Sequence, residues 1–216
     1  MQESELDLRS LIKPTDGPVS RHINRRISTR ITRIIVTKNV PLTPDEVSVI
    51  SFLLAIASGI AFYLGMPFLG GILAQISSII DGVDGELARA RGMMTKRGGF
   101  LDTMLDRLAD IMICAGMIVY LAEDGLSLIK LLVGLLAVTG SVLPAYLAAE
   151  ANARSINVDL FVPPNLRPPA SRDVRLFIVL LGGITGLILP SLVLLAAITY
   201  INTIMKICLV YYRMRR

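Results

Sequence analysis

The sequence predicts an all-α integral membrane protein in which six transmembrane helices follow an amphipathic interfacial helix. Its mean hydropathy of +0.64 and its hydrophobic fraction of 53% exceed what a soluble domain of 216 residues carries. The chain also contains six apolar segments close to the length of about 20 residues that a bilayer requires. Its basic residues gather on alternate connections between these segments, as in proteins that cross a membrane several times.

The six predicted spans are joined by short connections on one side of the membrane. Pro44, Asp45 and Glu46 suit the first turn of the first helix, where proline and negative charge are both favoured. The short connections GMP, EDG and LPS lie at 65–67, 123–125 and 189–191. The predicted spans are 47–65, 67–88, 100–122, 127–150, 174–189 and 191–211.

The distribution of positive charge predicts how the chain is oriented. Of the 22 Lys and Arg residues, all except Lys130 fall in the N-terminal segment, in 89–107, in 154–175 or at the C-terminal end. This asymmetry predicts cytoplasmic termini and cytoplasmic long connections in a multi-pass protein of the cell (plasma) membrane. The net charge of +5 suits contact with anionic lipid. We expect no nucleic-acid partner, because the basic stretches lack interleaved aromatic residues.

An amphipathic juxtamembrane helix is predicted within residues 17–40, ahead of the first span. Isoleucines recur at helical spacing and arginines lie opposite, which is typical of a helix in the cytoplasmic interface of a membrane. Packing of this helix on the protein's own cytoplasmic surface is an equally good interpretation. The isoleucines are Ile23, Ile27, Ile31, Ile34 and Ile35, and the arginines are Arg25, Arg26, Arg30 and Arg33.

The remaining segments complete the predicted domain organisation. Residues 1–16 form a polar tail or linker without the apolar core of a cleavable signal peptide. Residues 41–216 form the predicted six-helix transmembrane domain. Cys114 and Cys208 each lie in an apolar run, so we expect small buried hydrophobes rather than a disulfide or a metal pair.

Carboxylates lie in the predicted second and third spans, where an ionised side chain is costly and indicates function. Asp81 and Asp84 are three residues apart and share one face of the second helix. Asp102 and Asp106 are four apart and share one face of the third, and Asp110 continues that face one turn deeper. A cytoplasmic connection joins the two helices, so we expect antiparallel neighbours whose acidic faces meet near the cytoplasmic boundary.

Converging carboxylates repel one another unless a positive charge compensates, and divalent cations supply that charge. Oxygen ligands without His or Cys suit Mg²⁺, Mn²⁺ or Ca²⁺ rather than Zn²⁺. Two such ions could clamp phosphoryl oxygens and activate an attacking hydroxyl. Arg89, Lys96 and Arg97 could bind a diphosphate at the mouth, although the cytoplasmic excess of basic residues also explains them. Small residues nearby permit close approach of a ligand or of another helix: Gly85, Ala88, Gly98 and Gly99.

The spacing of these residues resembles that of a known sequence signature. The pattern D-x2-D-G-x2-A-R-x8-G-x3-D-x3-D is matched at every position by Asp81, Asp84, Gly85, Ala88, Arg89, Gly98, Asp102 and Asp106. This pattern resembles the signature of the CDP-alcohol phosphotransferase (CDP-alcohol phosphatidyltransferase) family of integral membrane enzymes. The resemblance covers most of residues 17–216, because six membrane helices after an interfacial helix are also typical of that family.

The resemblance implies a reaction and a role for each matching residue. The hydroxyl of one alcohol would displace CMP from a CDP-linked alcohol and form a phosphodiester, with two Mg²⁺ or Mn²⁺ ions at the site. The metal ligands would be Asp81, Asp84, Asp102 and Asp106, with Asp81 and Asp102 bridging both ions. Asp106 would also be the catalytic base. The nucleotide-binding residues would be Pro44, Asp45, Gly85, Ala88, Arg89, Thr95 and Gly98, and the family more often has Asn at the position of Asp45.

Basic residues of the second cytoplasmic connection predict the kind of acceptor. Arg172 and Arg175 are three residues apart at the entrance of the fifth span, where they suit an acceptor that carries a phosphate, such as inositol phosphate. Arg154 and Lys38 are further candidates. Anchoring of a helix end explains the pair Arg172 and Arg175 equally well. The segment LIKPTDGPVSRHINRRIS resembles archaeal members of the family, some of which carry a cytidylyltransferase domain ahead of the membrane part.

The resemblance leaves several substrates open. The favoured branch is di-myo-inositol-phosphate phosphate synthase, with CDP-inositol as donor. Phosphatidylinositol- or archaetidylinositol-phosphate synthase, with a lipid CDP-alcohol as donor, follows closely, and phosphatidylglycerophosphate or phosphatidylserine synthase is an alternative. The family implies a homodimer, and the favoured branch implies a fused or separate cytidylyltransferase. Outside enzymes the alternative is a divalent-cation transporter, but the third span carries no charged residue beyond Asp110.

Overall fold

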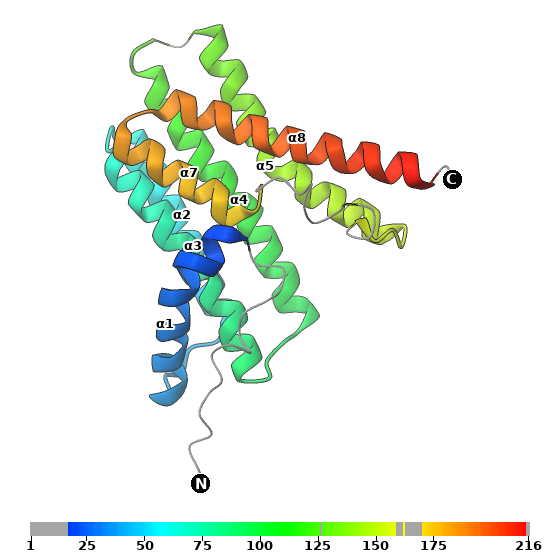
Figure 1. The fold of residues 1–216 in the computed structure, drawn as a ribbon. Coiled ribbons are helices and arrows are strands. Elements are labelled where there is room, and N and C mark those ends of the chain that lie inside the picture. Colours follow the sequence, from blue (N-terminus) through cyan, green and yellow to red (C-terminus); the bar gives the residue numbers. More distant parts are fainter. Residues whose placement is uncertain (1–16, 126, 159–161, 163–169, 215–216) are drawn as a thin grey trace.

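The computed structural model describes residues 17–125, 127–158, 162 and 170–214. All regular elements in these ranges are helical (Figure 1). A π-helical turn, η1 (Ser20–Asn24), continues directly into α1 (Arg25–Thr37). A helix follows at the place of each predicted span: α2 (Pro44–Tyr63), α3 (Pro67–Ala90), α4 (Lys96–Ala122), α5 (Leu128–Ala153), α7 (Arg172–Thr185) and α8 (Ile188–Met214). The predicted tail, residues 1–16, lies outside the described ranges.

Local hydrogen bonds explain where the two helices around the carboxylates begin. Thr43 caps α2, because its hydroxyl accepts from the backbone N–H of Glu46 while the Glu46 carboxylate accepts from the N–H of Thr43. Pro44 occupies the first turn, as the sequence predicts. Thr95 caps α4, and its hydroxyl accepts from the N–H of Gly98 at 3.0 Å.

Three of the described helices, α2, α5 and α8, are long and apolar enough to cross a membrane. Helices α3 and α4 carry the acidic residues, and α7 has 14 residues, a rise of about 21 Å, which is shorter than a bilayer core of about 30 Å. The expectation of an all-helical protein with apolar helices is thus confirmed for the described residues, whereas six membrane spans remain a prediction.

Helix α2 packs against both α3 and α4 along their length, whereas α3 and α4 contact each other little. The two helices are therefore linked mainly through α2, and their own direct contacts are few. Glycines, which have no side chain, explain how α2 and α4 pack so closely. A Cβ on Gly59 would lie 2.5 Å from the carbonyl oxygen of Met112, and a Cβ on Gly116 would collide with the backbone of Gly59.

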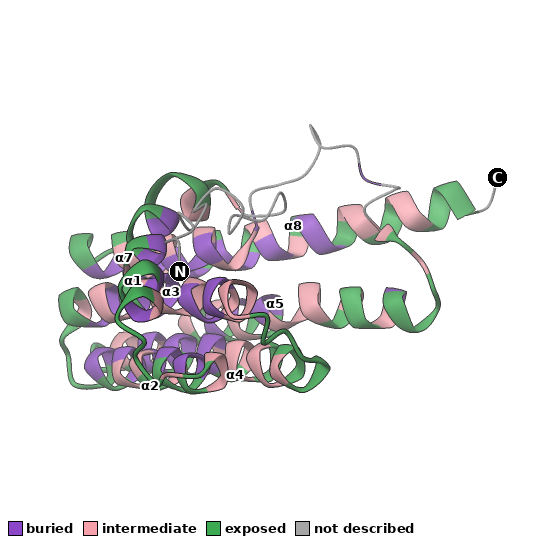
Figure 2. Ribbon diagram, turned by 90° about the horizontal axis from the view of Figure 1, so that it is seen from below, coloured by how far each residue is buried: buried purple, intermediate pink, exposed green. Residues whose placement is uncertain are grey.

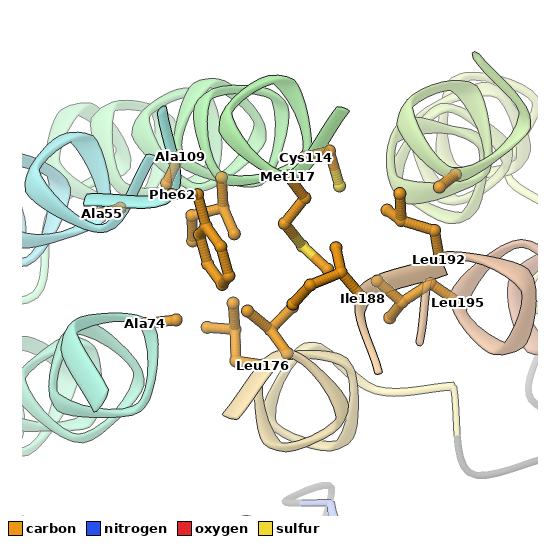
Figure 3. Close-up of a cluster of buried hydrophobic side chains, with 13 residues drawn as sticks. Ala55, Phe62, Ala74, Ala109, Cys114, Met117, Leu176, Ile188, Leu192 and Leu195 are labelled. Carbon is orange, nitrogen blue, oxygen red and sulfur yellow. The ribbon is translucent and has the colours of Figure 1, made fainter. Parts of the chain in front are cut away.

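The other helices complete the bundle around one apolar cluster. Helix α7 packs on α3, where a Cβ on Gly183 would lie 2.9 Å from the Cα of Gly71, and α8 pairs with α5. Figure 3 shows Phe62, Met117 and Ile188 pointing toward one another between the helices. The cluster includes Ala74 of α3 and Ala109 of α4, so it joins the two helices that carry the acidic residues.

The distribution of burial is that of a protein whose surroundings are apolar. Serines and threonines such as Ser51 and Thr199 are buried between helices, while large apolar side chains lie on the outside. In the most apolar windows of α5 and α8 only 22% and 28% of residues are buried, and exposed and intermediate residues recur along both helices (Figure 2). Cys114 is buried as expected, but Cys208 is exposed because its part of α8 extends beyond the bundle.

The N-terminal helix packs on α3 while much of its apolar side stays exposed. Ile23, Ile27 and Ile34 are 40%, 42% and 52% exposed. The face that contacts α3 is polar in its first turns, where Arg25 and Ser28 are buried, and apolar toward the end of α1, where Ile35 is buried. The helix thus packs on the protein's own surface while most of its isoleucines face outward, and its placement in the interface of a membrane stays a prediction.

Candidate active site

The acidic faces of α3 and α4 meet at one point. Asp81 from α3, with Asp102 and Asp106 from α4, offers carboxylate oxygens that all lie within 4.8 Å of one another. Oxygen ligands of Mg²⁺ or Ca²⁺ lie about 2.0–2.6 Å from the ion, so two ligands of one ion are separated by at most about 5 Å. The spacing and the all-oxygen donor set therefore fit a hard divalent cation. The predicted convergence is confirmed for these three residues.

Asp84, the fourth predicted ligand, is held differently. It is buried, and its carboxylate accepts a hydrogen bond of 2.5 Å from the hydroxyl of Ser48 on α2 and another from the N–H of Gly85. It is not among the three carboxylates that lie within 4.8 Å of one another. Its role as a metal ligand stays a prediction, and Ser48 is a contact that the sequence analysis did not foresee.

A guanidinium from α7 lies among the carboxylates. The Nη1 atom of Arg172 is 2.9 Å from Asp81 and 2.9 Å from Asp106, and its Nε atom is 3.4 Å from Asp110. Two carboxylates at 4.8 Å repel by about 3 kcal/mol at an effective dielectric constant of 20, so a cation between them is strongly favoured. Arg172 supplies that positive charge in this arrangement.

Asp110 is the centre of a second ion-pair network beneath the cluster. It is buried and lies 3.0 Å from the guanidinium of Arg175 and 3.2 Å from that of Arg107. Both arginines also donate to the carbonyl oxygen of Ser141 on α5, each at 2.9 Å. The network joins α4, α5 and α7. Arg107 was not singled out from the sequence, although it lies one position beyond Asp106.

A cavity of about 140 Å³ opens on one side of the carboxylates, between α2, α3 and α4. Gly98 lies in its wall, and a Cβ there would lie 3.0 Å from the Asp45 carboxylate and 3.1 Å from the Thr95 hydroxyl. Ser48, Asp84 and Asp102 line its inner end. All seven residues predicted to bind the nucleotide line this one cavity: Pro44, Asp45, Gly85, Ala88, Arg89, Thr95 and Gly98.

A second cavity, of about 210 Å³, lies on the other side of the same residues. It shares Asp84, Gly85, Arg89 and Asp102 with the first cavity and adds Asp81 and Arg172. Its outer wall comes from the N-terminal segment and α7. The residues of that wall are Gly17, Ser20, Asn24, Arg25 and Asp173. The carboxylates thus lie where two cavities meet.

The four residues predicted to bind the acceptor are in different surroundings. Arg172 lines the second cavity, while Arg175 is buried behind it in the Asp110 network. Lys38 is exposed at the end of α1, and Arg154 is exposed and pairs with Glu150. Neither Lys38 nor Arg154 lines the described cavities at the carboxylates. All four assignments stay predictions.

Comparison with known proteins identifies the family. Residues 41–211 match the family model of CDP-alcohol phosphatidyltransferases, a range that covers most of the chain. The chain therefore belongs to the CDP-alcohol phosphatidyltransferase family. Together with its apolar helices, this membership makes it a membrane protein.

Two relatives illustrate the likeness in sequence. A bifunctional IPC transferase and DIPP synthase of Thermococcus kodakarensis is 41% identical over 177 residues, which are 81% of this chain and 39% of that protein. The chain thus spans about two fifths of the length of this relative. An archaetidylinositol phosphate synthase of Pyrococcus horikoshii is 30% identical over 167 residues, which are 77% of this chain and 82% of that protein.

Solved structures of one protein have the same fold. The phosphatidylinositol phosphate synthase of Mycobacterium tuberculosis with CDP-DAG bound matches with a TM-score of 0.72 and 26% identity, over 86% of this chain and 94% of that chain. Its complex with manganese and citrate matches with a TM-score of 0.71 and 25% identity, over 86% and 89%. A protein of this fold thus binds a divalent cation.

Proposed function

We propose that the chain transfers a substituted phosphate group from a CDP-linked alcohol to a second alcohol and releases CMP. The observation that carries this proposal is the position of the acidic cluster between two cavities. One cavity is lined by every residue that the motif assigns to the nucleotide, and the other is polar and reaches Asp81 and Arg172. A transfer reaction needs such an arrangement, because donor and acceptor must meet at one phosphorus atom.

In the donor cavity, the cytidine group would lie against α2 and the start of α4. Its diphosphate would reach the inner end, where Arg89 can donate to phosphate oxygens. Asp81, Asp84, Asp102 and Asp106 would hold two Mg²⁺ or Mn²⁺ ions, which supply charge neutralisation for the diphosphate. The metal-bound relative and the oxygen-only donor set support this part of the proposal.

The acceptor hydroxyl would approach from the second cavity. Its oxygen would form a bond to the phosphorus that carries the donor alcohol, and the bond from that phosphorus to the CMP oxygen would break. A carboxylate oxygen of Asp106 would take the hydroxyl proton. Arg172, which lies 2.9 Å from Asp106 and would give way to the ions there, lines the cavity through which the acceptor would enter.

Inositol phosphate is the acceptor that we favour. The named relatives include archaetidylinositol and phosphatidylinositol phosphate synthases, and the second cavity has guanidinium groups beside its carboxylates and neutral polar groups. Arg172 is positioned for the acceptor phosphate, with Arg175, Arg154 and Lys38 as further candidates. The donor would be CDP-inositol or a lipid CDP-alcohol. Phosphatidylglycerophosphate or phosphatidylserine synthesis is the weaker alternative.

The proposal includes a setting in the cell. We expect six spans in the plasma membrane, with the two cavities and both termini on the cytoplasmic side, in a homodimer. The 39% coverage of the bifunctional relative supports a fused or separate cytidylyltransferase that would supply the donor. The asymmetric distribution of basic residues supports the orientation.

The experiment is to incubate purified protein with a panel of CDP-alcohols and acceptors and to follow CMP release with Mg²⁺, with Mn²⁺ and with EDTA. We expect release only with a divalent cation and with a matching pair, best with inositol phosphate. Glu123 is exposed and lines neither cavity, so Glu123→Gln is the control for effects of purification and assay. Uptake of Mn²⁺ into liposomes without CMP release from any pair would reject the proposal in favour of a transporter.

A further inference from the structure

The N-terminal segment forms a wall of the second cavity. Gly17, Ser20, Asn24 and Arg25 line it, and no described residue before Pro44 lines the first cavity. The segment therefore touches only the side of the site that the proposed function assigns to the acceptor. Its polar groups are held by contacts with α3 and α7, so its contribution to the site is the position of this wall.

Two contacts fix the first turns of this wall. The N–H of Ser20 donates to the Asp173 carboxylate at the start of α7, at 2.6 Å. The side chain of Asn24 donates to the hydroxyl of Ser78 at 3.0 Å and accepts from the amide of Gln75 at 2.7 Å. Asn24 thus uses both ends of its amide to hold its position on α3.

A buried carboxylate on α3 holds the following turns. Glu86 is fully buried and accepts three hydrogen bonds from α1, from Arg25 at 2.5 Å, from Ser28 at 2.6 Å and from Thr32 at 2.7 Å. Arg25 also donates to the carbonyl oxygen of Gly82 at 3.1 Å. A buried carboxylate is stable only while such donors surround it, so Glu86 and α1 constrain each other strongly.

Glu86 does not itself reach the reacting groups. It lies two residues after Asp84, about 200° further round the helix, and it lines neither cavity. Within one turn, α3 therefore presents Asp84 to the active site and Glu86 to α1. Any movement of α1 relative to Glu86 would shift Arg25 and Asn24, and with them the wall of the second cavity.

We propose that Glu86 is a positioning residue that fixes the N-terminal helix as the acceptor-side wall of the active site. This inference rests on the proposed function, because it assigns the second cavity to a hydroxyl-rich alcohol phosphate. Loss of the Glu86 charge loosens the wall and weakens acceptor binding, while the donor cavity keeps its residues. A role confined to general stability would instead affect donor and acceptor alike.

Two matched pairs of variants test the proposal. Glu86→Gln is compared with Glu123→Gln, the same change at an exposed residue, and Arg25→Gln is compared with Arg26→Gln, its exposed neighbour. We expect Glu86→Gln and Arg25→Gln to raise the KM for the acceptor about tenfold or more, as loss of a charge-assisted hydrogen bond does, and to change the KM for the donor less than about twofold. Glu123→Gln and Arg26→Gln are expected to match the unmodified protein.

Equal changes in both KM values, or no change in either, would overturn the proposal. If Glu86→Gln does not fold, Thr32→Val removes one of the three donors to the carboxylate and the same comparison applies. Hydrogen exchange gives a readout without substrate. Amides of residues 20–37 should exchange faster in Glu86→Gln while those of α4 do not, and unchanged exchange in 20–37 would reject the positioning role. Absence of CMP release from the unmodified protein would reject the proposed function, and hydrogen exchange would still decide whether Glu86 holds the wall.

Discussion

At the scale of single residues, the site depends on how charges are shared between Asp106, Arg172 and Asp110. Arg172 contacts all three of Asp81, Asp106 and Asp110, so the carboxylates proposed to bind metal already have a cationic partner. Metal binding to Asp81 and Asp106 must therefore compete with the guanidinium. Asp110, one turn deeper, can retain Arg172 through its Nε contact at 3.4 Å when the outer contacts change.

Arg172→Gln is predicted to tighten metal binding. Removing the competing cation leaves carboxylates that repel one another, so the Kd for Mn²⁺ should fall about tenfold, equivalent to about 1.4 kcal/mol. The same change should lower the thermal unfolding midpoint in EDTA, because the repulsion is then uncompensated. Mn²⁺ titration by electron paramagnetic resonance measures the first effect, with Arg213→Gln at an exposed position of α8 as the control. Weaker Mn²⁺ binding in Arg172→Gln would show that the arginine does not compete with the ion.

Asp106→Asn is predicted to separate binding from turnover. The amide cannot accept the hydroxyl proton, so kcat should fall about 10²–10⁴-fold, as for loss of a general base. The Kd for the CDP-alcohol should change far less, because Asp81, Asp84 and Asp102 remain. CMP release and equilibrium binding of the donor measure the two quantities. A variant with near-normal kcat would remove Asp106 from the role of base.

At the scale of helices, glycines allow α4 to pack closely against α2. Gly59 and Gly116 let the two backbones touch, and Asp102 and Asp106 lie further along the same helix α4. On the other side, the Asp110 network ties α4 to α5 and α7 through Arg107 and Arg175. The distance between the acidic faces therefore depends on contacts that lie one to three turns away from the carboxylates.

Gly116→Val is predicted to destabilise the protein and to spread the acidic cluster. A Cβ at this position would overlap the backbone of Gly59, which cannot move without moving α2. Overpacking of this kind costs about 1–3 kcal/mol or more. The thermal unfolding midpoint in detergent measures the cost. Gly99→Ala is the control, since a Cβ on Gly99 would have no atom of the described residues within 4 Å, and equal midpoints for the two variants would contradict the close-packing explanation.

Much of the helical framework could be predicted from the sequence, because each helix carries local signals. The N-cap residues Thr43 and Thr95 mark the starts of α2 and α4, and apolar runs mark the interiors of the helices. The packing face of α1 could not be predicted from hydrophobicity, since a membrane protein can bury a polar face. Contacts of Ser48 and Glu86 were also missed. For the Ser48 contact, the sequence offered one indication, which is the recurrence of Ser48, Ser51 and Ser58 at helical spacing in an apolar helix.

At the scale of the whole molecule, charge lies on a few helices and apolar surface on the others. Few residues are buried in the apolar helices α5 and α8, while α3, α4 and α7 carry the charged groups of the site. The spacing of the motif predicted the convergence of Asp81, Asp102 and Asp106, although Asp84 is not part of that cluster. It carried no information on Arg172 entering the cluster, because that contact joins residues far apart in the chain and depends on how α7 packs against α3.

Topology provides a prediction at this scale. If the two cavities open to the cytoplasm, a single cysteine at exposed Lys96 should react with an impermeant maleimide in inverted vesicles and not in right-side-out vesicles. A cysteine at exposed Glu123 should show the opposite pattern, because it lies at the other end of α4. Both are introduced after replacing exposed Cys208. Labelling of both positions from the same side would contradict a membrane-spanning α4.

The most direct test of the proposed metal site is the location of Mn²⁺ by anomalous X-ray scattering in crystals of the protein grown with Mn²⁺ and a CDP-alcohol. We expect two peaks among Asp81, Asp84, Asp102 and Asp106. The diphosphate should contact both ions, and the cytidine should lie in the cavity between α2, α3 and α4. Arg172 should then have left its position between Asp81 and Asp106. Peaks elsewhere, or a nucleotide bound away from these carboxylates, would contradict it.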